Sequence, residues 1–170
     1  MRSDNIWTAN TKMGQLISPM IRTSTWFKFV PPLDWSESNE QGRLVYRSPK
    51  GEALIVSATG IAGSRSETEE EEVRGQLLQN AFDAMVAAAS KPDLKVIRKL
   101  RSDERVRGVE CWTLEAETLD SRAVFLQSVF RNGMGILFVT FEAHNCTEAK
   151  LKYERFLTSV EANNRASGDN

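Results

Sequence analysis

Residues 122–143, RAVFLQSVFRNGMGILFVTFEA, predict two antiparallel strands joined at Asn132-Gly133. An Asn-Gly pair between two alternating apolar runs is the strongest short-range signal for a β-hairpin. Because side chains alternate along a strand, a two-residue turn at 132–133 or at 133–134 assigns every residue to the same face. The segment therefore predicts which side chains share each face of the sheet.

The two predicted faces of this hairpin differ in polarity. One face is apolar apart from a single hydroxyl and carries Val124, Leu126, Ser128, Phe130, Leu137, Val139, Phe141 and Ala143. The other mixes apolar and polar groups and carries Phe125, Gln127, Val129, Arg131, Ile136, Phe138, Thr140 and Glu142. The first is typical of a core face, and the second is more apolar than a solvated face needs. We expect cover on one side and a partner or a second layer on the other.

Length and composition indicate one ordinary globular domain. The chain has 170 residues, of which 41% are hydrophobic and 26% charged. A domain of this size buries roughly 70% of its unfolded surface, so it needs no metal or disulfide for stability. The net charge of −1 gives no overall attraction to nucleic acid or to an anionic membrane.

The residues given contain no signal for secretion or membrane insertion. Residues 1–15 lack an apolar core and a small-residue cleavage site, and no stretch approaches ~18 apolar residues. Cys111 and Cys146 have no C-x-x-C spacing and are expected to be reduced thiols. We therefore expect a cytoplasmic protein that is not embedded in a membrane.

The remaining strands and turns follow from local signals. Residues 26–30 predict a strand that Pro31-Pro32 ends, and residues 43–48 and 53–59 predict a hairpin. Further strands are expected at 94–101 and at 106–117. We expect an irregular N-terminal arm at 1–24, a single domain at 25–162 and a disordered tail at 163–170.

Two helices complete the prediction. Residues 66–90 predict the longer one, because Ser66 and Glu69 have the spacing of a capping box and apolar residues follow at i, i+4. A last helix is expected after Asn145 or Thr147. The order β-β-β-α-β-β-β-β-α predicts an α+β fold with a single, mainly antiparallel sheet on which the helices pack, because strands and helices do not alternate.

Several strings and their order resemble the PsbP-like fold family, which includes the Mog-type import factors and the DcrB-related proteins. The strings are TWFKFVPPLDW (25–35), GRLVYRSPKGEALIVSATG (42–60), LKVIRKLRS (94–102) and RVRGVECWTLEAE (105–117), followed by the 122–143 hairpin and the closing helix. The resemblance covers residues 25–162 and implies a PsbP/Mog-like fold.

Within this family the chain is most similar in style to the Eag-type chaperones of type VI secretion. That resemblance implies a groove on the sheet that shields an apolar helix of a secreted effector. The implied partner-binding residues are Val45, Ile55, Ser57, Leu126, Ser128, Phe130 and Val139. Ser57 and Ser128 would orient the helix. From the residues alone, each serine is equally consistent with a hydrogen bond inside an ordinary core.

No pattern in the chain predicts catalysis, a metal site or nucleic-acid binding. His144 is the only histidine, and one histidine with two distant cysteines matches no usual zinc spacing. The basic segment 95–107 lacks aromatic residues for base stacking, and the acidic run 67–72 suits a helix start. We expect no catalytic residue, no metal, no cofactor and no nucleic-acid partner.

The sequence thus predicts a non-enzymatic cytoplasmic protein-binding module, a chaperone or adaptor for an effector with apolar helices. The alternative is an immunity or inhibitory protein that binds a toxin through loops and charged surface. A third reading places a small apolar ligand in a cavity between the sheet and the helices. A homodimer is left open.

Overall fold

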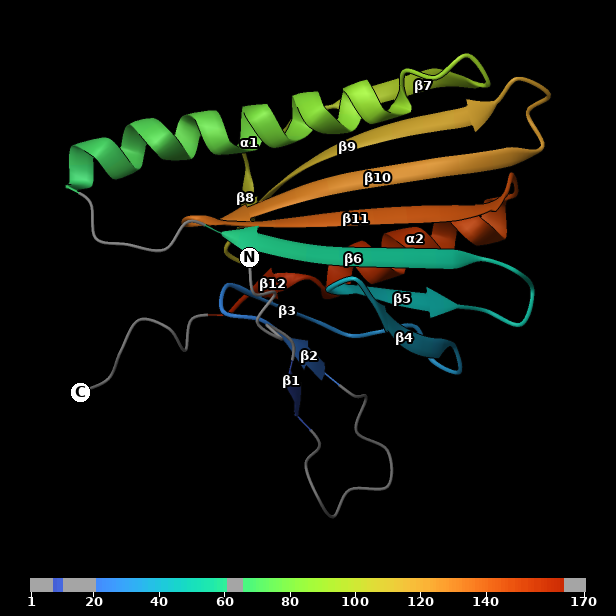
Figure 1. Ribbon diagram of the computed structural model, residues 1–170, viewed down its shortest axis with the longest axis horizontal. Helices are drawn as coiled ribbons and strands as arrows, with labels where there is room; N and C mark the ends of the chain where they lie inside the picture. The colour runs from blue at the N-terminus through green and yellow to red at the C-terminus, as the bar shows by residue number, and fades with distance from the viewer. Residues whose placement is uncertain (1–7, 11–20, 61–65, 164–170) are drawn as a thin grey trace.

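The computed structural model describes residues 8–10, 21–60 and 66–163, which form two antiparallel sheets and two helices (Figure 1). The strands of the large sheet lie in the order β4 (Ser36–Glu40), β5 (Arg43–Arg47), β6 (Ala53–Gly60), β11 (Gly135–His144), β10 (Ala123–Asn132), β9 (Val109–Thr118) and β7 (Leu94–Leu100). The short strand β8 (Arg105–Val106) pairs with β9. The helices are α1 (Glu67–Ala89) and α2 (Thr147–Ser159).

The predicted hairpin is confirmed as β10 and β11. Ser128 lies opposite Val139 and Asn132 opposite Gly135, so the turn is Gly133-Met134. Gly133 has a φ of 56°, a left-handed conformation that glycine adopts without strain. The pairing register confirms the predicted membership of both faces.

The prediction of a single sheet is wrong. A second, four-stranded sheet joins β1 (Thr8–Asn10), β2 (Ile21–Thr23), β3 (Phe27–Phe29) and β12 (Glu161–Ala162). The predicted irregular arm at 1–24 contributes two of these strands, and its other residues before β2 lie outside the described ranges, as do 164–170 of the predicted tail. Strands of two or three residues are too short to show an alternating pattern, so sequence periodicity did not reveal them.

The element order also differs from the prediction, because the expected strand 106–117 is divided. Arg107 and Gly108 have φ values of 52° and 78° and form the turn between β8 and β9. The Arg107 guanidinium donates to the carbonyl oxygens of Leu157 (3.2 Å) and Val160 (3.1 Å) at the end of α2. The turn therefore ties the large sheet to α2.

The helix starts agree only in part with the prediction. Ser66 caps α1 as expected: its hydroxyl accepts from the Glu69 amide (3.3 Å), and the Glu69 carboxylate accepts from the Ser66 amide (3.2 Å). At α2, neither Asn145 nor Thr147 is the cap, because Cys146 occupies that position without a side-chain hydrogen bond. The side-chain amide of Asn145 instead donates to the Ser121 carbonyl oxygen at 2.9 Å.

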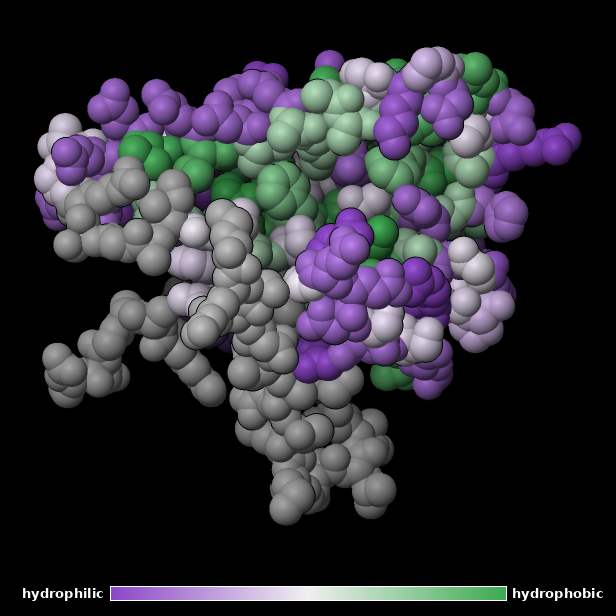
Figure 2. Space-filling model, in the orientation of Figure 1, coloured by the Kyte–Doolittle hydropathy of each residue, from purple (hydrophilic) through white to green (hydrophobic). Residues whose placement is uncertain are grey.

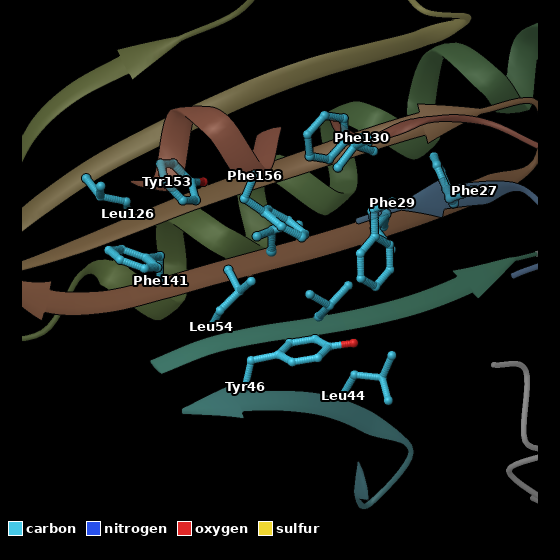
Figure 3. Packing of buried hydrophobic residues seen from close by; sticks show 14 of the residues in the cluster. Phe27, Phe29, Leu44, Tyr46, Leu54, Leu126, Phe130, Phe141, Tyr153 and Phe156 are labelled. Atoms are coloured by element: carbon cyan, nitrogen blue, oxygen red, sulfur yellow. The ribbon is translucent and has the colours of Figure 1, made fainter. Parts of the chain in front are cut away.

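The two helices pack on opposite faces of the large sheet and form two cores. The first core lies between the sheet, α2 and the small sheet, and includes Phe29, Tyr46, Leu54, Leu126, Phe130, Phe141, Tyr153 and Phe156 (Figure 3). The second lies under α1 and includes Leu78, Phe82, Met85, Leu114, Val129 and Ile136. Both faces of the hairpin are therefore covered, but to different extents.

Candidate partner-binding face

The seven residues implied by the family resemblance do not share one surface. Ser57 lies opposite Phe138, and Ile55 lies opposite both Val45 and Thr140, which places these residues on the α1 side. The other four belong to the alternate face of β10 and β11, on the α2 side: Leu126, Ser128, Phe130 and Val139. The implied set is therefore divided between opposite sides of the sheet.

The four residues on the α2 side are core residues, so their prediction as partner-binding residues is wrong. Ser128 is fully buried, and Leu126, Phe130 and Val139 are 5%, 1% and 1% exposed. The helix that covers this face is α2, and Ser128 shares a hydrogen bond with the Tyr153 hydroxyl of that helix. A partner cannot reach these side chains while α2 is in place.

The polar groups around Ser128 are buried with it. Burial raises the pKa of the Cys111 thiol to about 12, and it also raises the pKa of the Tyr153 hydroxyl. Because the thiolate is the reactive form of cysteine, such a pKa favours the less reactive thiol near neutral pH.

The α1 side is covered over only part of its width. The second core draws its sheet residues from β9, β10 and β11, and the described residues of β4, β5 and β6 contribute none. Strands lie ~4.8 Å apart, so the axes of β4 and β6 are about 10 Å apart. An α-helix with its side chains is ~10–12 Å across, so the width beside α1 is comparable to that of one helix.

We call the partly covered region beside α1 the open face. It comprises Ile55, Ser57, Phe125, Gln127, Phe138 and Thr140, on β6, β10 and β11. Phe125 and Phe138 also pack against the core under α1. All except Gln127 are partly exposed. Figure 2 shows this side of the molecule, where apolar side chains form a band below the hydrophilic outer surface of α1. The open face contains three large apolar side chains, those of Ile55, Phe125 and Phe138.

Polar groups on the open face retain unused hydrogen-bonding capacity. Gln127 is only 8% exposed, and its Nε2 donates to the Thr140 hydroxyl at 3.4 Å. Its Oε1 is buried without a hydrogen-bond partner among the described residues. A buried acceptor left unpaired costs about 1–3 kcal/mol, so rotation of the Gln127 amide toward a donor supplied by a partner would be favourable. As it stands this oxygen is shielded from a partner.

Val45 lies beside the open face but is not part of its accessible surface. It is 2% exposed, and on the same side of the strand pair the Arg47 guanidinium forms an ion pair with the Glu40 carboxylate at 2.7 Å. In the strand register, Val45 lies opposite Ser38, between the positions of Arg47 and Glu40. The hydrogen bond from Arg47 lowers the pKa of Glu40. This ion pair forms a charged rim on the side away from α1.

The resemblance alone did not single out Gln127, although strand alternation was enough to place it. Gln127 lies opposite Thr140 on one side and Leu114 on the other, so it shares the α1 side with Ser57. Ser128, its neighbour in sequence, points to the α2 side. The resemblance did not indicate which residues of each matched string face the α1 side of the sheet.

The charged segments singled out in the sequence belong to the surface. Residues 67–69, 71 and 72 of the acidic run are exposed at the start of α1. In the basic segment, the Arg101 guanidinium lies 5.1 Å from the ring centroids of both Phe82 and Trp112. Since β7 pairs with β9 alone among the described strands, its lysines and arginines lie on a sheet edge, where charge opposes edge-to-edge association.

Neither a membrane helix nor a metal cluster is found in the described part of the chain. No helix in residues 8–10, 21–60 and 66–163 is long and apolar enough to cross a membrane. Over the same ranges, no group of three or more His, Cys, Asp and Glu residues is placed to hold a metal ion.

Comparison with known proteins supports the fold but identifies no close relative. No family model and no curated protein matches the sequence. The structure is similar to that of cyanobacterial PsbP (CyanoP) from Synechocystis sp. PCC 6803, with a TM-score of 0.55 and 19% identity over 90% of this chain and 98% of that one. LpqN of Mycobacterium tuberculosis, described as involved in cell envelope biogenesis, matches with a TM-score of 0.48 and 13% identity over 92% and 90%. The chain has a PsbP-like fold.

Proposed function

We propose that this protein is a non-enzymatic binding module that holds an apolar helix of another protein on its open face, beside α1. The observation that carries the proposal is the buried, unpartnered Oε1 of Gln127 on a partly covered apolar face. An apolar sheet surface alone would suit many kinds of binding partner. The unpaired acceptor adds a requirement for a donor, such as a hydroxyl on an otherwise apolar helix.

The composition of the open face suits a helix better than a globular surface. Ile55, Phe125 and Phe138 offer apolar area, and burying such area contributes ~25 cal/mol per Å² before the cost of ordering the partner. Between them, Ser57, Thr140 and Gln127 form a polar seam that can hydrogen-bond with small polar side chains of the helix. The bound helix would lie between α1 and the rim formed by Arg47 and Glu40.

The role we propose is that of a cytoplasmic chaperone or adaptor. Its guest is a secreted effector with apolar helices, in keeping with the resemblance to the Eag-type chaperones of type VI secretion. Such helices aggregate in water unless their apolar surface is covered. A protein that covers one helix while the effector awaits secretion needs a face of the size and polarity found here.

The first test replaces Ser57 of the open face with arginine. Ser57 is partly exposed, so the variant should stay folded, while the long charged side chain blocks the floor. We expect affinity purification of the wild-type protein from its native cell to recover a partner with long apolar helices. Ser57→Arg should reduce that recovery at least tenfold, and circular dichroism should be unchanged.

The matched control is Arg122→Glu, which changes a side chain that is 87% exposed on the β9–β10 turn. It should recover the same partner as the wild type. If the recovered protein lacks apolar helices and binds Ser57→Arg as strongly as the wild type, the helix-binding proposal fails. That outcome favours an immunity or inhibitory protein, which would bind a toxin elsewhere on its surface.

A second prediction separates a binding role for Gln127 from a structural one. Gln127→Leu removes the unpaired buried oxygen, so the free energy of unfolding should rise by about 1 kcal/mol in urea titrations. The same variant should bind the recovered partner more weakly, because the partner's donor loses its acceptor. Loss of stability without loss of binding would contradict this role. The opposite directions of the two effects distinguish function from packing.

A further inference from the structure

We propose a second binding site, a pocket between the Pro31-Pro32 turn and α2 that takes a medium-chain carboxylate. The pocket has a volume of about 420 Å³ and lies on the α2 side of the large sheet. Sites that bind small molecules have volumes of ~300–1,000 Å³. The pocket is on the opposite side of the sheet from the open face, so this inference is independent of the proposed function.

The walls of the pocket are apolar, and ring stacking and a hydrogen bond hold them in place. Trp35 stacks on Phe141 with the ring centroids 6.1 Å apart, and Leu54 and Phe156 complete the inner surface. The Ser159 hydroxyl accepts from the Val30 amide at 3.1 Å, which fixes the start of the proline turn against the end of α2. The pocket is therefore formed in the absence of a ligand.

Two basic residues of α2 line the pocket, and they differ in what they can offer a ligand. The Lys152 ammonium is held by the buried Glu52 carboxylate at 2.8 Å, and this hydrogen bond raises the pKa of Lys152. Arg155 lines the same pocket, and its guanidinium makes no hydrogen bond or ion pair with any described residue. Arg155 thus supplies one positive charge that no described acidic group neutralises.

An apolar pocket with one free guanidinium is complementary to an apolar chain that ends in a single carboxylate. A guanidinium pairs with a carboxylate through two parallel hydrogen bonds, which a hydroxyl cannot accept in the same way. A neutral apolar molecule would use the walls but not Arg155. A cationic amphiphile would be repelled.

The test is isothermal titration calorimetry of the full chain with decanoate, octanoate and decanol, the two carboxylates below their critical micelle concentrations and decanol below its solubility limit. Decanoate should bind in a 1:1 ratio, and the two extra methylenes should make it about tenfold tighter than octanoate. Arg155→Gln should weaken decanoate binding about tenfold or more and leave decanol binding unchanged. Arg155 is exposed, so the substitution should not disturb the fold.

Two further variants locate the site. Arg122→Gln removes an exposed arginine remote from the pocket and should bind decanoate like the wild type. Ser57→Arg, which blocks the open face, should also bind decanoate normally. The proposal is overturned if decanoate does not bind, if Arg155→Gln binds it as tightly as the wild type, or if Ser57→Arg abolishes binding. The last result would place the ligand on the open face.

Discussion

Ser128→Glu should unfold the protein, whereas Ser57→Glu should leave it folded. The two serines look equivalent in sequence, since each lies on an alternating strand among apolar neighbours. Ser128 is fully buried under α2, while Ser57 is partly exposed on the open face. A carboxylate at 128 would lose its hydration without gaining a cationic partner, at a cost of several kcal/mol. That cost is comparable to the ~5–15 kcal/mol that stabilises a typical domain.

Urea unfolding followed by circular dichroism measures both variants. Ser128→Ala is the informative intermediate, because it leaves the Tyr153 hydroxyl buried without its partner and should cost about 1–3 kcal/mol. The double variant Ser128→Ala with Tyr153→Phe should recover part of that loss, since both polar groups are then gone. A cooperatively folded Ser128→Glu protein with wild-type stability would mean that α2 does not cover this face.

The sequence predicted the sheet where local signals are strong. The turn at Gly133, the alternation along residues 123–144 and the capping box at Ser66 each depend on a few adjacent residues. These features could be predicted because the physics that sets them is local.

The side of the sheet covered by each helix was not predictable in the same way. Cover depends on where α1 and α2 dock, and both hairpin faces contain enough apolar residues to receive a helix. The small sheet was also missed, because β12 and β3 are joined by pairing between Ala162 and Phe27, far apart in the chain. Such contacts leave no periodic trace in a two-residue strand.

The residues that the resemblance implied lie on both sides of the sheet for a related reason. Ser57 and Ile55 lie on the open face, while Leu126 and Ser128 lie in the core. The resemblance matched whole strings of sequence, so it implied site residues on both faces of the strands. The pairing of β6 with β11 and of β11 with β10 places Ser57 and Gln127 on the same face of the sheet. Strand register and side-chain alternation are therefore both needed to identify the residues of the site.

Gly135→Ala should be among the most destabilising single-methyl additions in the chain, because Trp26 lies against the backbone there. The register pairs Gly135 with Gly60, and a Cβ at either position would approach the Trp26 ring more closely than 3.0 Å. Relief is hardest at Gly135, since the added methyl would meet Trp26 Cβ and Cγ, at the base of the side chain. The Trp26 backbone is held there because its carbonyl oxygen accepts from the Asn132 side chain (2.7 Å) and the Asn163 amide (2.9 Å). Overpacking of this kind costs ~1–3 kcal/mol, and we expect the upper end of that range.

Gly75→Ala is the matched control, since it adds the same methyl group to an exposed position of α1 with no neighbouring atom within 4 Å. It should stabilise the protein by about 0.5–1 kcal/mol, because alanine favours the helix. Adding Trp26→Ala to Gly135→Ala should make the glycine substitution much less costly, and a double-mutant cycle from urea titrations measures that coupling. Equal costs of Gly135→Ala with and without Trp26 would show that the ring does not lie on the glycine pair. In that case, close contact with the Trp26 ring would not be the reason for glycine at position 135.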